Sequence, residues 1–157
     1  MKCKLVPLLL FAAAASTAAV AGDAADPLCA PLRKFVESVE PKQTKSLTFH
    51  TVWGGNFKGE SRETIYAARC IDNGYAPAKA VCESLLKRSS KEFPSINVKR
   101  SLACLSPKTV FGTDLKLRQA EFEIDYGSDD DGSVVTVKFY EDLEMGSTAL
   151  SISAKRY

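Results

Sequence analysis

Of the five cysteines in this chain, Cys3 lies in the first 21 residues, which we expect to be removed, and the other four constrain the fold more than any other feature: Cys29, Cys70, Cys82 and Cys104. Their successive spacings are 41, 12 and 22 residues, and the only histidine is His50. Structural zinc sites draw their ligands from close pairs, so we expect neither a metal nor a cofactor. In an oxidising compartment, an even number of cysteines predicts a framework of two disulfides.

The first 21 residues predict that the chain reaches such a compartment. Lys2 and Lys4 precede an apolar, alanine-rich run that ends in the small residues 19–21. This order is typical of a secretory signal peptide, and the apolar core is too short to span a bilayer, which takes about 20 apolar residues. We expect cleavage after Ala21 to release one domain, residues 22–157, with no membrane span. The domain would be periplasmic or secreted.

The charge balance argues against nucleic acid as a partner. The chain has 21 basic and 19 acidic residues, and loss of Lys2 and Lys4 makes the two numbers equal. Basic and acidic residues are interspersed, whereas a protein that neutralises phosphates concentrates its lysines and arginines in one place.

Hydrophobic periodicity predicts two helices and several strands. Apolar residues recur at helical spacing over 27–39 and again from Pro77 until Phe93 and Pro94 interrupt the pattern. Residues 46–53 and 63–71 are extended runs on either side of a glycine-rich turn, which predicts a hairpin. Residues 96–104 alternate apolar and polar side chains and predict a further strand.

The last third of the chain predicts a β-meander with a defined register. Pairing Tyr126 with Ser133 across a glycine-bounded turn sets Phe122 opposite Val137 on one apolar face. A shift by one residue would bury the acidic side chains, so the pattern allows one register. A final strand follows through residues 150–154.

These elements predict an α+β fold: an antiparallel sheet of about six strands, with a C-terminal β-meander, covered by two helices and stapled by two disulfides. Four cysteines allow three pairings. Cys82 lies on the apolar face of a predicted helix and Cys104 on the apolar side of a predicted strand. We therefore favour a Cys82–Cys104 bridge, which leaves Cys29 with Cys70.

The residues that catalysis would need are scarce. One mid-strand histidine, His50, and no free cysteine leave no nucleophile beside an oriented base, so a non-enzymatic protein is the favoured interpretation. Glu121 and Glu123 share a strand face and could serve a hydrolase, but that face is solvated and would not raise a carboxyl pKa. Arg100 is expected to reach solvent at a sheet margin or to pair with an acid; reading a ligand is the alternative.

Two segments are candidate binding sites. The turn from Trp53 through Asn56 to Phe57 carries the only tryptophan, and aromatic anchors dominate interface energies. The alternative is that these aromatic side chains fold back onto the core.

The second candidate is an acidic hairpin tip made of Asp129, Asp130 and Asp131. A calcium loop of the EF-hand type needs Gly at its sixth and Glu at its twelfth position, where this chain has Val134 and Tyr140. A turn stabilised by its glycine is therefore expected, with docking or weak calcium binding as alternatives.

Together these observations favour an exported, non-enzymatic protein-binding module of the bacterial envelope, of the inhibitor or immunity type. Its partner would be another envelope or secreted protein. The alternatives are a periplasmic cell-wall or glycan hydrolase that uses the surface carboxylates, and a small-molecule carrier with a cleft between helices and sheet.

Overall fold

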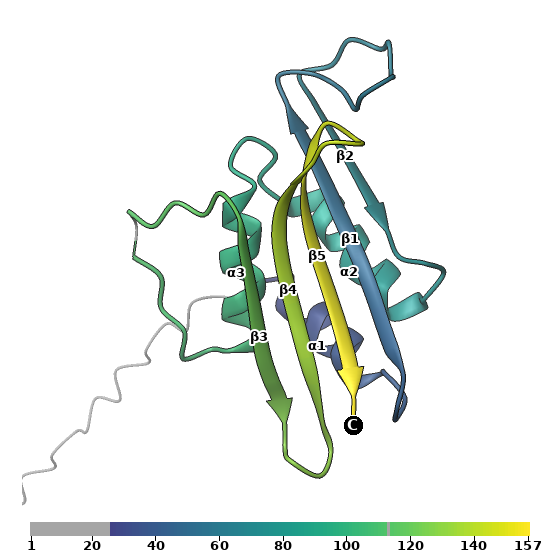
Figure 1. Cartoon of the computed structure of the whole chain (residues 1–157), viewed down its shortest axis with the longest axis vertical. Helices are drawn as coiled ribbons and strands as arrows, with labels where there is room; N and C mark the ends of the chain where they lie inside the picture. Colours follow the sequence, from purple (N-terminus) through teal and green to yellow (C-terminus); the bar gives the residue numbers. More distant parts are fainter. Residues whose placement is uncertain (1–25, 113) are drawn as a thin grey trace, which may run out of the picture.

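The computed structural model describes residues 26–112 and 114–157 (Figure 1). The predicted signal peptide at residues 1–21 lies outside the described residues, so its presence and cleavage stay predictions. Eight elements follow in order: α1 (Cys29–Glu37), β1 (Thr44–Trp53), β2 (Tyr66–Ile71), α2 (Ala76–Arg88), α3 (Ser95–Leu105), β3 (Ala120–Gly127), β4 (Gly132–Asp142) and β5 (Ser147–Arg156).

The five strands form one antiparallel sheet in the order β2-β1-β5-β4-β3. The β1–β2 hairpin therefore joins the C-terminal meander through pairing of β1 with β5. All three helices lie on the same face of the sheet (Figure 1). The predicted α+β class, the antiparallel sheet and the C-terminal meander are confirmed, with five strands in place of about six.

Strand alternation divides the sheet into an inner face, covered by helices, and an outer face. On the inner face Phe49, Val137 and Ile152 are buried, and they pack in one core with Phe35 of α1 and Val98 of α3. Burying each such side chain contributes about 1.5–3 kcal/mol. This core holds the sheet and helices as one packed unit.

The predicted register of the β3–β4 hairpin is confirmed. Tyr126 pairs with Ser133 and Phe122 with Val137. The outer-face ion pair between Glu121 and Lys138 follows from the same register, with 2.9 Å between Nζ and the carboxylate. Alternation alone was sufficient here because one face is buried and the other is wet.

The strand predicted at residues 96–104 is wrong, because this segment is helix α3. Its buried positions include Val98, Ser101 and Leu102, which follow a helical and not an alternating period. Two of its buried side chains are polar: the Asn97 amide exchanges two hydrogen bonds with the Ser90 backbone, at 2.7 and 2.9 Å, and the Ser101 hydroxyl donates to the Asn97 carbonyl. In the sequence, these polar residues alternate with apolar ones, as they would in a strand with one solvated face. In the structure they are buried instead, because their hydrogen bonds are made inside the protein.

The favoured disulfide pairing is also wrong. The bridges are Cys29–Cys104 and Cys70–Cys82. Cys104 lies in α3, which packs against α1, so its nearest thiol is Cys29 at the start of α1. Cys82 lies in α2 above the sheet edge, opposite Cys70 of β2. The error follows from placing Cys104 in a strand.

Candidate functional site

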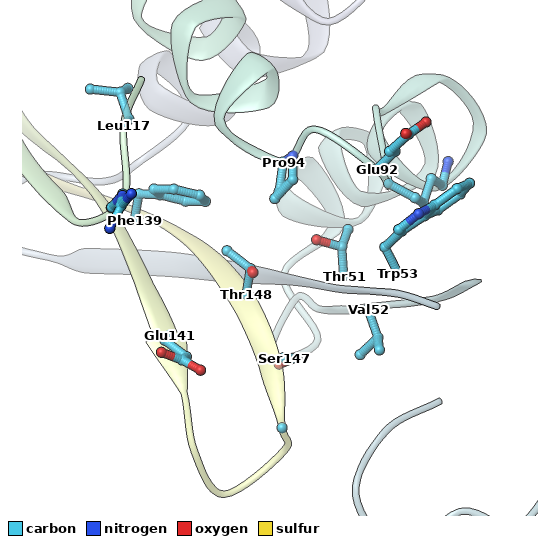
Figure 2. A pocket seen from close by; sticks show the side chains of 13 residues that line it. Thr51, Val52, Trp53, Glu92, Pro94, Leu117, Phe139, Glu141, Ser147 and Thr148 are labelled. Carbon is cyan, nitrogen blue, oxygen red and sulfur yellow. The ribbon is translucent and has the colours of Figure 1, made fainter. Parts of the chain in front are cut away.

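An open groove lies at the end of the inner face that the helices leave uncovered (Figure 2). Its volume is about 520 Å³. Thr51 and Thr148 rise from adjacent strands as its floor, and Pro94, from the α2–α3 connection, stands above them. Phe139 and Trp53 line it on opposite sides. We call this space the inner groove.

The rim of the inner groove carries balanced charge. Lys91 and Glu92 come from the α2–α3 connection, Arg118 from the segment before β3, and Glu141 from the end of β4. The Lys91 ammonium donates to two backbone carbonyls at 2.9 and 3.1 Å, and partial burial lowers its pKa. Two cations and two acids leave the rim without a strong preference for either sign of ligand charge.

A stacked aromatic pair stands beside the inner groove. Trp53 ends β1, and its cross-strand partner Tyr66 begins β2. The two rings are 6.5 Å apart between centroids with an angle of 9° between their planes, and each residue is 51% exposed. Lys91 Nζ lies 6.0 Å from the centre of the Tyr66 ring. Paired, half-exposed aromatic side chains of this kind are typical of binding surfaces.

The structure separates the two aromatic residues of the turn that the sequence placed in one candidate site. Trp53 shares the inner face with Phe49, whereas Phe57 is 5% exposed and packs beneath the Arg69 guanidinium, 4.6 Å from its ring centre. Arg69 pairs with His50 and so lies on the outer face. Of these two aromatic side chains, Trp53 is the one that is exposed at the inner groove.

Asn56 stabilises the same turn. Its carboxamide oxygen accepts the Phe57 backbone N–H at 2.9 Å, and its NH₂ donates to the Arg62 carbonyl at 3.0 Å. Both ends of the amide are thus used within the loop.

The acidic tip lies at the other end of the sheet, in the β3–β4 turn (Figure 1). Asp129 and Asp130 are exposed. Asp131 forms an ion pair with Arg156 of β5. The Arg156 guanidinium also donates to the backbone carbonyls of Glu37 and Val39 at the C-terminal end of α1. The tip and Trp53 therefore lie at opposite ends of the sheet and form two separate candidate sites.

His50 is buried on the outer face at the junction of three strands. Its Nδ1 lies 3.1 Å from the Ser147 hydroxyl and 3.7 Å from an Asp142 carboxylate oxygen. Burial lowers the His50 pKa, Asp142 opposes this effect, and the Arg69 charge adds to it. Serine, histidine and aspartate thus meet, but a hydrolase triad needs the serine and the acid on different ring nitrogens, and here both approach Nδ1.

The remaining candidates have structural partners. Arg100 lies on α3 and binds the Asp26 carboxylate through two hydrogen bonds, at 2.6 and 2.8 Å, so it pairs with an acid as the sequence suggested. This ion pair lowers the Asp26 pKa. Glu121 and Glu123 stand on the outer face, where Lys138 neutralises the first.

Within residues 26–112 and 114–157, no three His, Cys, Asp or Glu side chains gather as metal ligands would. No helix in that part of the chain is both long and apolar enough to cross a bilayer.

Sequence reasoning missed most of the inner groove. Tyr66, Lys91, Pro94 and Leu117 come from four separate segments. The approach of Tyr66 to Trp53 depends on the β1–β2 register, and the loop between these strands is too long to set that register. The positions of Lys91 and Pro94 depend on the turn between α2 and α3, which the sequence did not reveal.

Fold and site together define a class: a disulfide-bonded α+β protein with an antiparallel sheet, helices on one face, and an open aromatic-edged groove at one sheet end. Comparisons with protein-family models, with curated proteins and with solved structures found no match for this chain.

Proposed function

We propose that this protein is an exported, non-enzymatic binding module that docks a partner protein of the bacterial envelope at the inner groove. The half-exposed Trp53–Tyr66 stack beside this groove carries the proposal. Two large rings held against each other lose little side-chain entropy on binding, which suits an interface anchor. Two disulfides fit the oxidising location that the proposal requires.

An inhibitor or immunity-type protein is the favoured form of this function. Such a protein needs a rigid docking surface and no chemistry of its own. The geometry around His50 supports this choice over a hydrolase, because its ring is buried and both polar neighbours share Nδ1.

The rim charges define the kind of partner surface. Lys91 and Arg118 are matched by Glu92 and Glu141, so the partner segment should carry apolar or aromatic side chains with mixed charge around them. Association should then depend weakly on ionic strength, since a net-charged rim would steer its partner and lose affinity with salt.

A photo-crosslinking amino acid at position 66 tests the proposal in cells that export the protein. We expect one discrete crosslinked partner, which is then purified. Trp53→Ala should weaken its binding at least about tenfold, the loss expected for an interface anchor.

Position 157 provides the matched control, because Tyr157 is also 51% exposed but lies at the other end of the sheet. Crosslinking there should give no such product, and Tyr157→Ala should bind normally. Crosslinking from 157 and not from 66 would move the contact to the acidic tip. Unchanged affinity of Trp53→Ala would reject the inner groove.

A further inference from the structure

The sheet has two edge strands, and the hydrogen-bond pattern reveals which backbone groups each leaves free. In an antiparallel pair, alternate residues direct both backbone groups to the same neighbour. The Gly54 N–H donates to the Ile65 carbonyl at 2.9 Å, which sets the phase between β1 and β2. The free edge of β2 therefore carries the backbone groups of Tyr66, Ala68 and Cys70.

The opposite edge strand, β3, shows the same alternation of bonded and free backbone groups. The Tyr157 N–H donates to the Gly132 carbonyl at 3.3 Å, so alternate residues of β4 face β5 and the others face β3. The free backbone groups of β3 then belong to Glu121, Glu123 and Asp125. A row of like charges protects an edge strand from pairing with another chain.

The β2 edge lacks this protection. Its free-edge residues are neutral, and the strand has no proline or lysine. Its one charge, Arg69, lies on the outer face and pairs with Glu60. The Thr64 hydroxyl donates to the Tyr66 carbonyl at 2.7 Å. An open space of about 550 Å³ lies between residues 66–69 and the loop of residues 56–65.

We propose that two copies of this chain pair through their β2 strands, antiparallel about a two-fold axis at Ala68, so that the two sheets become continuous. In this register Ala68 faces Ala68 of the second copy, and Tyr66 faces its Cys70. The Ala68 pair exchanges two hydrogen bonds between free backbone groups. In the Tyr66–Cys70 pairs the Tyr66 carbonyl already accepts from the Thr64 hydroxyl, and it accepts the Cys70 N–H on its second lone pair. An isologous contact of this kind closes at the dimer.

Two exposed isoleucines select this register. Ile65 is 72% and Ile71 41% exposed, and both point to the outer face at opposite ends of β2. The proposed axis sets Ile65 of each copy opposite Ile71 of the other, and Arg69 opposite Ala67. Apolar cross-strand pairs stabilise a sheet.

The neighbouring registers are worse. A shift of the axis to Arg69 opposes two like charges and loses one hydrogen-bonded pair. A shift to Ala67 also loses a pair and sets Ile65 opposite Arg69. The inner groove lies on the helix-covered face, so the dimer would present two grooves. Because Tyr66 lies beside both the inner groove and the proposed dimer contact, a crosslink from position 66 to a second copy of the chain reports the dimer, whereas a crosslink to a different protein reports the partner at the groove.

Sedimentation equilibrium of the oxidised chain lacking residues 1–21 measures the association. At about 100 µM, above the micromolar range of modest interfaces, we expect a dimer. Ala68→Pro removes an N–H at the two-fold axis and should raise the dissociation constant about tenfold or more. Glu123→Pro is the matched control, because it removes a free-edge N–H on β3 and should leave the mass unchanged.

A second pair of variants tests the register without a proline. Two residues facing each other across a hydrogen-bonded pair have Cα atoms about 5.5 Å apart, within disulfide reach. Ala68→Cys should therefore form a covalent dimer on oxidation, whereas Ala67→Cys should not. A monomeric wild type at this concentration overturns the proposal, as does a dimer that Ala68→Pro leaves intact. Equal crosslinking of both cysteine variants overturns the register.

Discussion

Single residues show how environment and not residue type decided the role of each polar group. His50, Asn56 and Arg100 all looked available for chemistry or binding in the sequence. In the structure each has partners that hold a strand, a helix or a loop in place. Trp53 is the candidate that remains exposed beside a groove.

His50 should make stability depend on pH. Burial lowers its pKa below the ordinary 6.5, so protonation favours the unfolded chain. The free energy of unfolding is therefore not reduced by His50 above pH 6.5, where the ring is neutral in both states. It decreases as the pH falls from 6.5 through the lower folded-state pKa, because only the unfolded chain takes up the proton in this range. The free energy of unfolding, measured with urea, should be smaller at about pH 5 than at about pH 8.

His50→Asn is the natural control, because His50 is the only histidine in the chain. The variant should flatten the profile between these two values. The Asp26 carboxyl, whose pKa is lowered by Arg100, acts at more acidic pH. A profile that stays the same in the variant would assign the dependence to another group.

At the scale of secondary-structure elements, α3 is a helix where the sequence predicted a strand. Asn97 joins α3 to the end of α2, because its amide satisfies both backbone groups of Ser90. Asn97→Ala leaves those partly buried groups without protein partners, and each unpaired group costs up to about 1–3 kcal/mol where water does not reach it.

Chemical denaturation should therefore show a loss of a few kcal/mol for Asn97→Ala. The exposed neighbour Ile96→Ala, 43% accessible in the same helix, should change stability by about 0.5 kcal/mol or less. Similar small losses for both would mean that water replaces the Asn97 contacts.

The two disulfides act on the whole molecule because they restrict the unfolded chain. The Cys29–Cys104 bridge spans 75 residues and the Cys70–Cys82 bridge 12. In the loop-entropy description they contribute about 4.5 and about 3 kcal/mol, respectively. Paired serine variants of the first bridge should therefore unfold at lower urea concentration than those of the second.

Peptide mapping without reduction checks the connectivity first, and thiol titration of the unfolded, oxidised protein should find no free sulfhydryl among these four cysteines. If the two serine pairs lose equal stability, folded-state packing and not loop length controls the effect.

The sequence by itself determined what depends on neighbours along the chain. The apolar stripes of α1 and α2 and the whole β3–β4 register follow from local periodicity and turn residues, since one buried face admits only one arrangement. The even number of cysteines after residue 21 and the order of the predicted elements also favoured a disulfide-bonded α+β protein.

Tertiary structure alone decided the type of α3, the cysteine pairing and the separation of Trp53 from Phe57. Each depends on which distant segment supplies a partner: Ser90 for Asn97, α1 for Cys104, and Arg69 for Phe57. The sequence does not show whether a polar or aromatic side chain contacts a partner inside the protein or only water. A buried side chain with a satisfied contact stabilises the fold, whereas an exposed one is available for binding.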